Sequence, residues 1–218
     1  MLAVIAATAL LQTPNTISAY EKQNGWKLLF DGKTTNGWTN YKSKTIGKGW
    51  VVKDGVLTIE DAGTAGDIAT TGMYDWFELS LEFNMAQGQN SGIMFRVTDE
   101  GDYPWHSGPE VQIYDHPVQE GVETTGYLYQ LYPAVKDASR PAGEWNIMRI
   151  HIAQDKCWTS LNGVKLYEYV YGSEDFWARA KKSKFNVYPQ FAKAKTGRIA
   201  IQGDHGNVSF RNIKIKNL

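Results

Sequence analysis

The fold class is decided by a ten-residue stretch, Trp158-Thr159-Ser160-Leu161-Asn162-Gly163-Val164-Lys165-Leu166-Tyr167. Two short runs rich in apolar and β-branched residues flank Asn162-Gly163, and both runs have the length of a strand. Asn-Gly tolerates positive φ at both central positions of a tight turn, and the twist of such a turn matches that of the flanking strands. The stretch therefore predicts a β-hairpin.

The same signal occurs earlier in the chain, where Asp54-Gly55 separates residues 50–53 from residues 56–59. From Trp26 onward, short apolar or alternating runs recur, and each ends at Gly, Asp or Asn, which is typical of a sandwich or barrel. Further strands are expected at 77–84, 92–97, 110–114, 127–131, 146–153, 198–201 and 208–215. The chain is therefore predicted to be all-β.

One segment departs from the strand pattern. Ser173 can cap a helix, Glu174 and Asp175 suit its positive N-terminal end, and lysines 181, 182 and 184 suit its other end. We expect one short surface helix here, and no repeat or low-complexity linker divides the chain.

Composition sets the broad limits. A length of 218 residues supports one sandwich domain, and 23 basic residues balance 23 acidic ones. Without a net positive field, nucleic acid is not an expected partner. Cys157 is the only cysteine, so an intramolecular disulfide is excluded, and we expect it to be a small strand residue.

The first residues favour export. Residues 1–11 form an uncharged apolar run that fits the hydrophobic region of a secretory signal but is too short to span a bilayer. We expect residues 1–20 to be a signal peptide or a disordered N-terminus, residues 21–218 to form one domain, and the protein to be secreted or periplasmic. A wrongly assigned start codon or a buried first strand is the alternative. No membrane span is expected elsewhere.

Strand periodicity predicts a polar surface. In residues 90–97 it sends Ile93, Phe95 and Val97 into the core and turns Asn90, Gly92, Met94 and Arg96 outward. In residues 110–114 it turns Glu110 and Gln112 outward. If these strands pair, Arg96, Glu110 and Gln112 form a hydrogen-bonding surface, and Gly92 leaves room for a ligand. The alternative is an ordinary cross-strand ion pair between Arg96 and Glu110.

Other side chains could converge on that surface. Tyr127 and Tyr129 share one strand face, and His205, in Asp204-His205-Gly206, can change charge near neutral pH. A structural role for such a loop histidine is the alternative. His106 and His116, with Asp115, could bind a divalent metal, although Asp and His pair readily by chance in loops. No zinc-protease, serine-hydrolase or phosphate-loop motif is present.

At these residues the sequence resembles the 3-keto-disaccharide hydrolase domain family over about residues 25–218. The matching pieces, in order, are residues 26–33, 36–38, 90–93, 96, 108–113, 127–129, 141–146, 161–164, 199–202, 204–206 and 208–215. One departure is that Gly203 separates Gln202 from Asp204, where the family usually runs Gln-Asp-His-Gly without a break. The resemblance implies an antiparallel two-sheet jelly-roll sandwich of the concanavalin A-like lectin/glucanase type.

The resemblance also implies cleavage of glycosides that carry a ketone at sugar carbon 3. Such a ketone acidifies the hydrogen on carbon 2, so a base can remove it and the glycosidic oxygen can leave carbon 1. Glu110 or His205 would be the base, and Arg96 with Gln112 would hold the oxyanion. A divalent cation could replace Arg96 in the stabilising role, and the sequence leaves open whether a metal is needed. The residues expected to contact this small-molecule sugar are Asn90, Trp105, Asp115, Tyr127 and Tyr129, with Asp115 or Tyr129 also able to orient a partner or protonate the leaving group.

Two other functions stay open. Glu110, Gln112 and Asp115 loosely match the carboxylate row of sandwich glucanases, which act on unoxidised glycans, but Gln112 stands where that row carries an acid. A lectin-like module could instead bind sugar through Trp105, Tyr114 and Tyr127. The fold itself cannot choose among these functions. The sequence does not indicate an oligomeric state.

Overall fold

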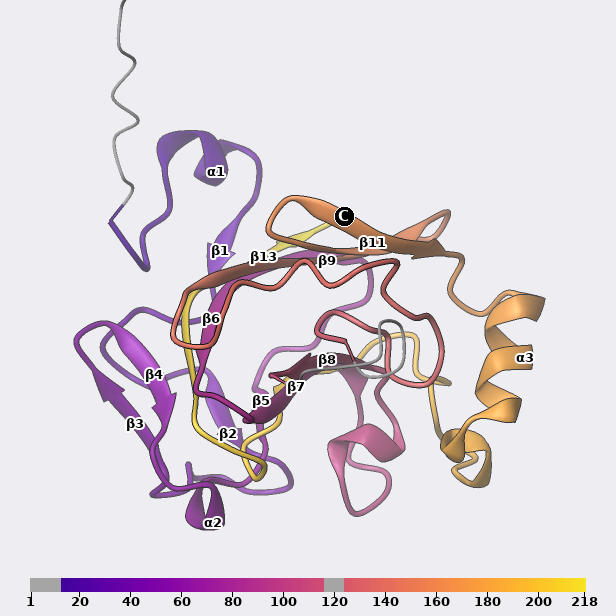
Figure 1. Cartoon of the computed structure of the whole chain (residues 1–218), viewed down its shortest axis with the longest axis horizontal. Helices are drawn as coiled ribbons and strands as arrows, with labels where there is room; N and C mark the ends of the chain where they lie inside the picture. Colours follow the sequence, from indigo (N-terminus) through magenta and orange to yellow (C-terminus); the bar gives the residue numbers. More distant parts are fainter. Residues whose placement is uncertain (1–12, 116–123) are drawn as a thin grey trace, which may run out of the picture.

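The computed structural model describes residues 13–115 and 124–218, and within them two antiparallel sheets pack face to face (Figure 1). In spatial order, the larger sheet comprises β11 (Val164–Tyr169), β10 (Cys157–Leu161), β9 (Asn146–Ile152), β6 (Phe77–Met85), β13 (Val208–Asn217), β4 (Val56–Ile59) and β3 (Trp50–Lys53), with β1 (Lys27–Leu28) beside β13. The smaller sheet comprises β2 (Trp38–Asn40), β5 (Ile68–Thr70), β12 (Arg198–Ile201), β7 (Asn90–Val97) and β8 (Glu110–Tyr114). The predicted two-sheet sandwich is confirmed.

Both predicted hairpins are present. Asp54 and Gly55 have φ values of 51° and 80°, and they join β3 to β4. Asn162 and Gly163 have φ values of 50° and 82°, and they join β10 to β11. The turn residues therefore adopt the left-handed conformations that the sequence pattern required.

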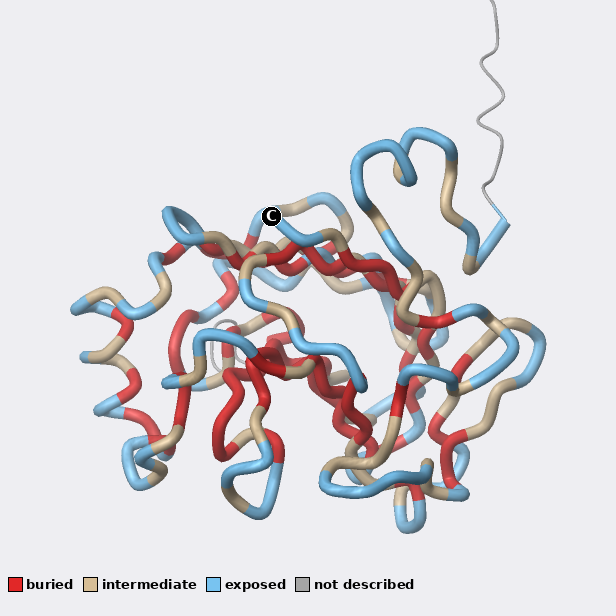
Figure 2. Tube along the Cα trace, turned by 180° about the vertical axis from the view of Figure 1, so that it is seen from behind, coloured by how far each residue is buried: buried red, intermediate tan, exposed pale blue. Residues whose placement is uncertain are grey.

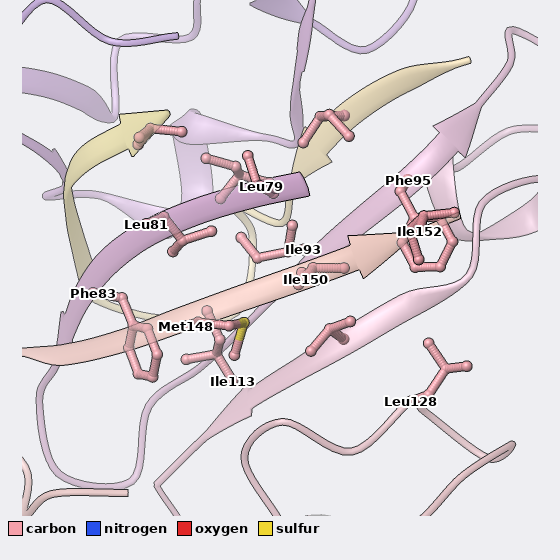
Figure 3. Packing of buried hydrophobic residues seen from close by; sticks show 14 of the residues in the cluster. Leu79, Leu81, Phe83, Ile93, Phe95, Ile113, Leu128, Met148, Ile150 and Ile152 are labelled. Atoms are coloured by element: carbon pink, nitrogen blue, oxygen red, sulfur yellow. The ribbon is translucent and has the colours of Figure 1, made fainter. Parts of the chain in front are cut away.

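The core lies between the sheets and is continuous. Alternate residues of β6 and β9 in the larger sheet meet Ile93, Phe95 and Ile113 from the smaller one (Figure 3). Buried residues follow both sheets, whereas exposed residues gather in the connections (Figure 2). Cys157 is buried in β10, as expected of a small strand residue. Truncating one of the fully buried phenylalanines would cost about 3–5 kcal/mol, so this core holds the sheets in place.

Helices are short and lie outside the sheets. The predicted helix is α3 (Glu174–Lys182), capped by the Ser173 hydroxyl, and it lies at one end of the sandwich (Figure 1). The prediction of a single helix was incomplete, because helices and 3-10 turns of three to five residues are too short to give a helical pattern in the sequence. These additional elements are α1 (Ala19–Gln23), α2 (Ala62–Ala65), η1 (Pro104–His106) and η2 (Lys184–Val187).

The predicted strand at residues 127–131 is wrong. Leu128 makes only isolated bridges, to Val111 and to Tyr132, and Gln130 has a φ of 59°. A left-handed residue turns the chain back on itself, so the segment forms a tight loop beside β8 instead of a ladder. Tyr129 N–H nevertheless donates to the Glu110 carbonyl at 2.9 Å, which fixes this loop against the strand that carries Glu110.

The description of the N-terminal region begins at residue 13. The whole hydrophobic run at residues 1–11 lies outside the described residues, so the expected signal peptide stays a prediction. Asn15 donates through Nδ2 to the Gly55 carbonyl at 2.7 Å, and Glu21 pairs with Lys214 at 2.8 Å, so residues 13–24 pack on the larger sheet. Among the described residues, no helix is both long and apolar enough to cross a membrane.

Candidate active site

A pocket of about 360 Å³ lies on the outer face of the five-stranded sheet, away from the core. Its lining comes from β7, β8, the end of β12, η1, the loop after β8 and η2. The lining residues are Asn90, Tyr103, Trp105, Glu110, Gln112, Tyr129, Lys184, Gln202, Asp204 and His205. Six residues that the sequence assigned to catalysis or sugar contact therefore meet in one pocket: Asn90, Trp105, Glu110, Gln112, Tyr129 and His205.

Glu110 begins β8 on the face that strand periodicity predicted. Val111 and Ile113 point into the core, and Glu110 and Gln112 point outward. β8 pairs with β7 so that Gly92 lies opposite Gln112, and a Cβ atom on Gly92 would lie 1.9 Å from Glu110 Oε1. The room that Gly92 leaves is therefore occupied by the Glu110 carboxyl group, not by a ligand.

The Glu110 carboxyl group is sheltered from water. The residue is 6% exposed, and this burial raises its pKa to about 7 because a carboxylate loses hydration. The nearby Lys184 ammonium opposes the rise, since a positive charge favours the ionised form. A carboxyl group with a pKa near neutrality can accept a proton and later return it.

His205 follows β12 in a loop and pairs with its neighbour Asp204. Nδ1 of His205 is hydrogen-bonded to Asp204 Oδ1, and half of the His205 side chain is exposed. Gly206 brings the loop close to Gln89, since a Cβ atom at Gly206 would lie 2.4 Å from Gln89 Oε1. The loop thus fixes one imidazole nitrogen on a carboxylate, and among residues 13–115 and 124–218 no group is hydrogen-bonded to Nε2.

The same pairing sets the charge of the histidine. The hydrogen bond to Asp204 raises the pKa of His205, burial opposes the rise, and the negative charges of Asp204, Asp67 and Glu110 add to it. The hydrogen bond with His205 in turn lowers the pKa of Asp204. The pair therefore favours an imidazolium beside a carboxylate, which is the arrangement of a general acid.

Three side-chain amides line the pocket and can bind hydroxyl or carbonyl groups. Gln112 Nε2 donates a long hydrogen bond of 3.4 Å to Asn90 Oδ1, and its second N–H has no partner within the described part of the chain. Gln202 is 7% exposed, and its Oε1 has no hydrogen-bond partner within residues 13–115 and 124–218. The amides give the pocket neutral hydrogen-bonding groups of the kind that orient a sugar ring.

Aromatic rings and one cation complete the pocket. The Tyr103 and Trp105 rings stack with centroids 5.6 Å apart, and Tyr103 is 49% exposed. Lys184 Nζ lies 4.8 Å from the centroid of Trp105 and 4.6 Å from that of Tyr129. Cation–π contacts therefore hold a positive charge at the pocket, where it can stabilise a developing anion.

Arg96 lies elsewhere, and its predicted place beside Glu110 is wrong. β7 carries one extra residue relative to β12, and Arg96 has a φ of 55° at this irregularity. Such a bulge reverses the alternation, so Val97 joins Met94 on the outer face and Arg96 turns away from Glu110. The alternative, a cross-strand ion pair between Arg96 and Glu110, is also absent from the described residues, where Arg96 pairs with Asp75.

The Arg96 guanidinium is part of the packing at the other end of β7. It lies 4.3 Å from the ring centroids of both Trp76 and Tyr171, and Nη2 donates to Asp75 at 3.2 Å. Arg96 is 3% exposed, so its charge serves this stack and not the pocket around Glu110.

Two expected sugar contacts also lie outside the pocket lining. Asp115 Oδ2 accepts a hydrogen bond of 2.7 Å from the Gly88 N–H, so it fastens the turn before β7. Tyr127 packs edge to face against Tyr129, with ring centroids 6.2 Å apart, and only Tyr129 lines the pocket. Glu110 and Asp115 therefore do not form the paired carboxylates of a glucanase at this pocket.

The suggested metal ligands are not brought together where the structure describes them. His106 Nδ1 accepts the Asp102 N–H at 3.1 Å, and its ring stacks on Tyr188 at 4.0 Å. Burial lowers the pKa of His106. Residues 13–115 and 124–218 contain no cluster of three His, Cys, Asp or Glu able to hold a metal, and His116 lies outside them. The metal hypothesis stays a prediction.

Sequence reasoning missed three pocket residues. They come from a loop (Tyr103), a 3-10 turn (Lys184) and the end of a strand (Gln202). The predicted strand pairing did not place any of these segments beside β8. Two signals were available. Tyr103 lies two residues before Trp105 in an aromatic loop. Gln202 is separated from the Asp204-His205-Gly206 segment by a single glycine, Gly203.

Comparison with known proteins places this chain in a family. A family model described as "3-keto-alpha-glucoside-1,2-lyase-like domain" matches residues 25–216. A protein of Bacteroides thetaiotaomicron named 3-keto-disaccharide hydrolase is 28% identical over 228 aligned positions, which cover 88% of this chain and 78% of that protein.

Solved structures agree on the fold. A candidate glycosyl hydrolase from Parabacteroides distasonis superposes with a TM-score of 0.85 at 30% identity, covering 94% of this chain and all of that one. The β-glucanase of Bacillus licheniformis superposes with a TM-score of 0.53 at 9% identity, covering 88% of this chain and 97% of that one, and this likeness concerns the fold alone. The predicted glucanase-type sandwich is confirmed.

Proposed function

Since the chain belongs to the 3-keto-alpha-glucoside-1,2-lyase-like domain family, we propose that it cleaves 3-keto-glycosides by elimination. The relative named 3-keto-disaccharide hydrolase supports this substrate class. One observation carries the mechanism: the buried Glu110 carboxyl group and the Asp204–His205 pair line the same pocket. A base and an acid are thus available to one small ligand.

Glu110 is the base in this mechanism. The 3-ketone acidifies the hydrogen on carbon 2, and the Glu110 carboxylate removes that proton. Its pKa of about 7 makes it a stronger base than an ordinary carboxylate, while a substantial fraction is still ionised at neutral pH. The electron pair of the C2–H bond then forms the enolate of the ketone.

The enolate oxygen needs a positive or hydrogen-bonding partner. With Arg96 in the packing at the far end of β7, Lys184 takes its role, and the free N–H of Gln112 adds a hydrogen bond. Preorganised donors of this kind contribute by a factor of about 100 to 1,000 each in other enzymes. Lys184 is the only lysine or arginine among the described residues that line the pocket, and His205 is assigned to the leaving group, so Lys184 is given the larger share.

His205 is the acid. When the enolate collapses, the bond from carbon 1 to the glycosidic oxygen breaks and its electrons leave with that oxygen. His205, charged beside Asp204, donates a proton from Nε2 to the departing oxygen. Addition of water across the resulting double bond, with a hydroxyl group on carbon 1 and a proton on carbon 2, then gives the free 3-keto sugar.

The function is tested by incubating the purified protein with a 3-keto-glucoside and, separately, with its unoxidised parent. Release of the aglycone from the keto compound alone is the expected result. Cleavage of the parent would replace elimination by a glucanase-type hydrolysis, and binding without turnover would make the protein a lectin-like module.

A further inference from the structure

Asp67 occupies a place on the outer face that the mechanism has not used. It directly precedes β5, and β5 pairs with β12 so that Ile68 lies opposite Ile201. The two-residue period places Ala69 on the outer face with Met94 and Ala200, and Asp67 has the same parity as Ala69. Asp67 therefore lies on the face that carries Glu110, across from the point where the chain leaves β12.

The Asp67 carboxylate holds the start of the His205 loop. Its Oδ1 accepts the Gly203 N–H at 3.0 Å. The two segments approach so closely that a Cβ atom on Gly203 would lie 2.2 Å from the Gly66 carbonyl oxygen, which also accepts the Trp50 indole N–H at 2.8 Å. Gly203, which separates Gln202 from Asp204, thus permits an anchor that a larger residue would block.

Asp67 interacts electrostatically with Asp204 and His205. Burial raises the pKa of Asp67 to about 6, the Gly203 hydrogen bond opposes the rise, Asp204 adds to it, and His205 favours the ionised form. The carboxylates that act on His205 are Asp204, Asp67 and Glu110, and the Lys184 ammonium lines the same pocket as His205. Asp67 is the one of the three that touches neither the ring nor the pocket.

We propose that Asp67 is a positioning residue that anchors the loop of residues 203–206 at the Gly203 N–H and serves as a second counter-ion that keeps His205 protonated. The anchor fixes the direction of the imidazole, and the counter-ion stabilises the protonated ring, which donates its proton to the leaving group. The second part rests on the acid role that the proposed function gives to His205.

Asp67→Asn separates charge from hydrogen bonding, because an asparagine Oδ1 can still accept the Gly203 N–H. Titration of the four histidine rings by NMR, with His205→Ala used for assignment, reads the result without turnover. We expect the pKa of His205 to fall by about half a pH unit or more in Asp67→Asn. The matched control is Asp155→Asn, which removes an exposed charge between β9 and β10 and should leave His205 unchanged.

Asp67→Ala removes the anchor as well. We expect kcat on a 3-keto-glucoside to fall by about tenfold or more below that of Asp67→Asn, since the loop loses its acceptor at Gly203. In Asp67→Asn the high-pH limb of the pH profile of kcat, which reports deprotonation of His205, should move to lower pH by the same amount as the His205 pKa measured by NMR. Equal kcat values for the two variants would overturn the anchoring role.

An unchanged His205 pKa in a folded Asp67→Asn protein would overturn the counter-ion role. If that variant does not fold, His205→Ala gives the reciprocal measurement, and the Asp67 carboxyl pKa should then rise above about 6. A constant Asp67 value would also overturn it. Absence of turnover on every 3-keto-glucoside would refute the proposed function, while the NMR shifts would still decide the electrostatic link.

Discussion

Replacing Glu110 with Gln should make the protein more stable at high pH while it loses turnover. The folded pKa of Glu110 is about 7 against an ordinary value of 4.5, so the unfolded chain releases this proton at lower pH than the folded one. Stability from this group is present below pH 4.5 and is lost as pH rises toward 7. The difference between the two pKa values, at 1.36 kcal/mol for each pH unit, corresponds to about 3 kcal/mol in the free energy of unfolding.

Gln keeps the shape of the side chain and cannot ionise, so Glu110→Gln should match the parent near pH 4.5. Above pH 7 it should exceed the parent by up to about 3 kcal/mol, or several degrees in Tm. Chemical denaturation at pH 5 and pH 8 measures this difference, and kcat should fall by about 100-fold or more at both. A stability gain that is equal at the two pH values would refute the burial argument, and retained turnover would refute the base assignment.

Three further substitutions test the other parts of the site. Lys184→Met should lower kcat by about 100-fold and, with the positive charge gone, move the Glu110 limb of the pH–rate profile to higher pH, whereas the exposed Lys182→Met should do neither. Gly92→Ala should lower kcat by about tenfold or more with the fold intact by circular dichroism, because its methyl group displaces the Glu110 carboxyl; an unchanged kcat would contradict the contact. Arg96→Lys should lower the free energy of unfolding by about 2 kcal/mol with kcat and KM unchanged, and the reverse result would return Arg96 to the site.

Local turn chemistry made much of the fold predictable. Asp54-Gly55 and Asn162-Gly163 specify their hairpins through residues next to each other in sequence, so no distant contact was needed. The same holds for Glu110 and Gln112, whose strand is regular and keeps its two-residue period. Where backbone geometry is set locally, the pattern of side chains is enough.

Prediction failed where tertiary contacts override the local period. Arg96 belongs to a strand by sequence, but its left-handed backbone depends on the pairing of β7 with β12 and on Gly197, whose Cβ would lie 2.3 Å from the Arg96 carbonyl carbon. Lys184 reaches the pocket, and Asp67 reaches the loop that carries His205, from segments that only the folded sheets bring near Glu110. A single sequence contains no signal for such long-range neighbours.

The central claim is that cleavage begins with removal of the hydrogen on carbon 2. Turnover of a 3-keto-glucoside in D₂O, followed by NMR of the released 3-keto sugar, measures this directly, with Glu110→Gln as the control for spontaneous exchange. The account predicts deuterium on carbon 2 of the product formed by the parent enzyme and loss of that enzymatic exchange in the variant. Product that retains its original hydrogen on carbon 2, released at the parent rate, would contradict it.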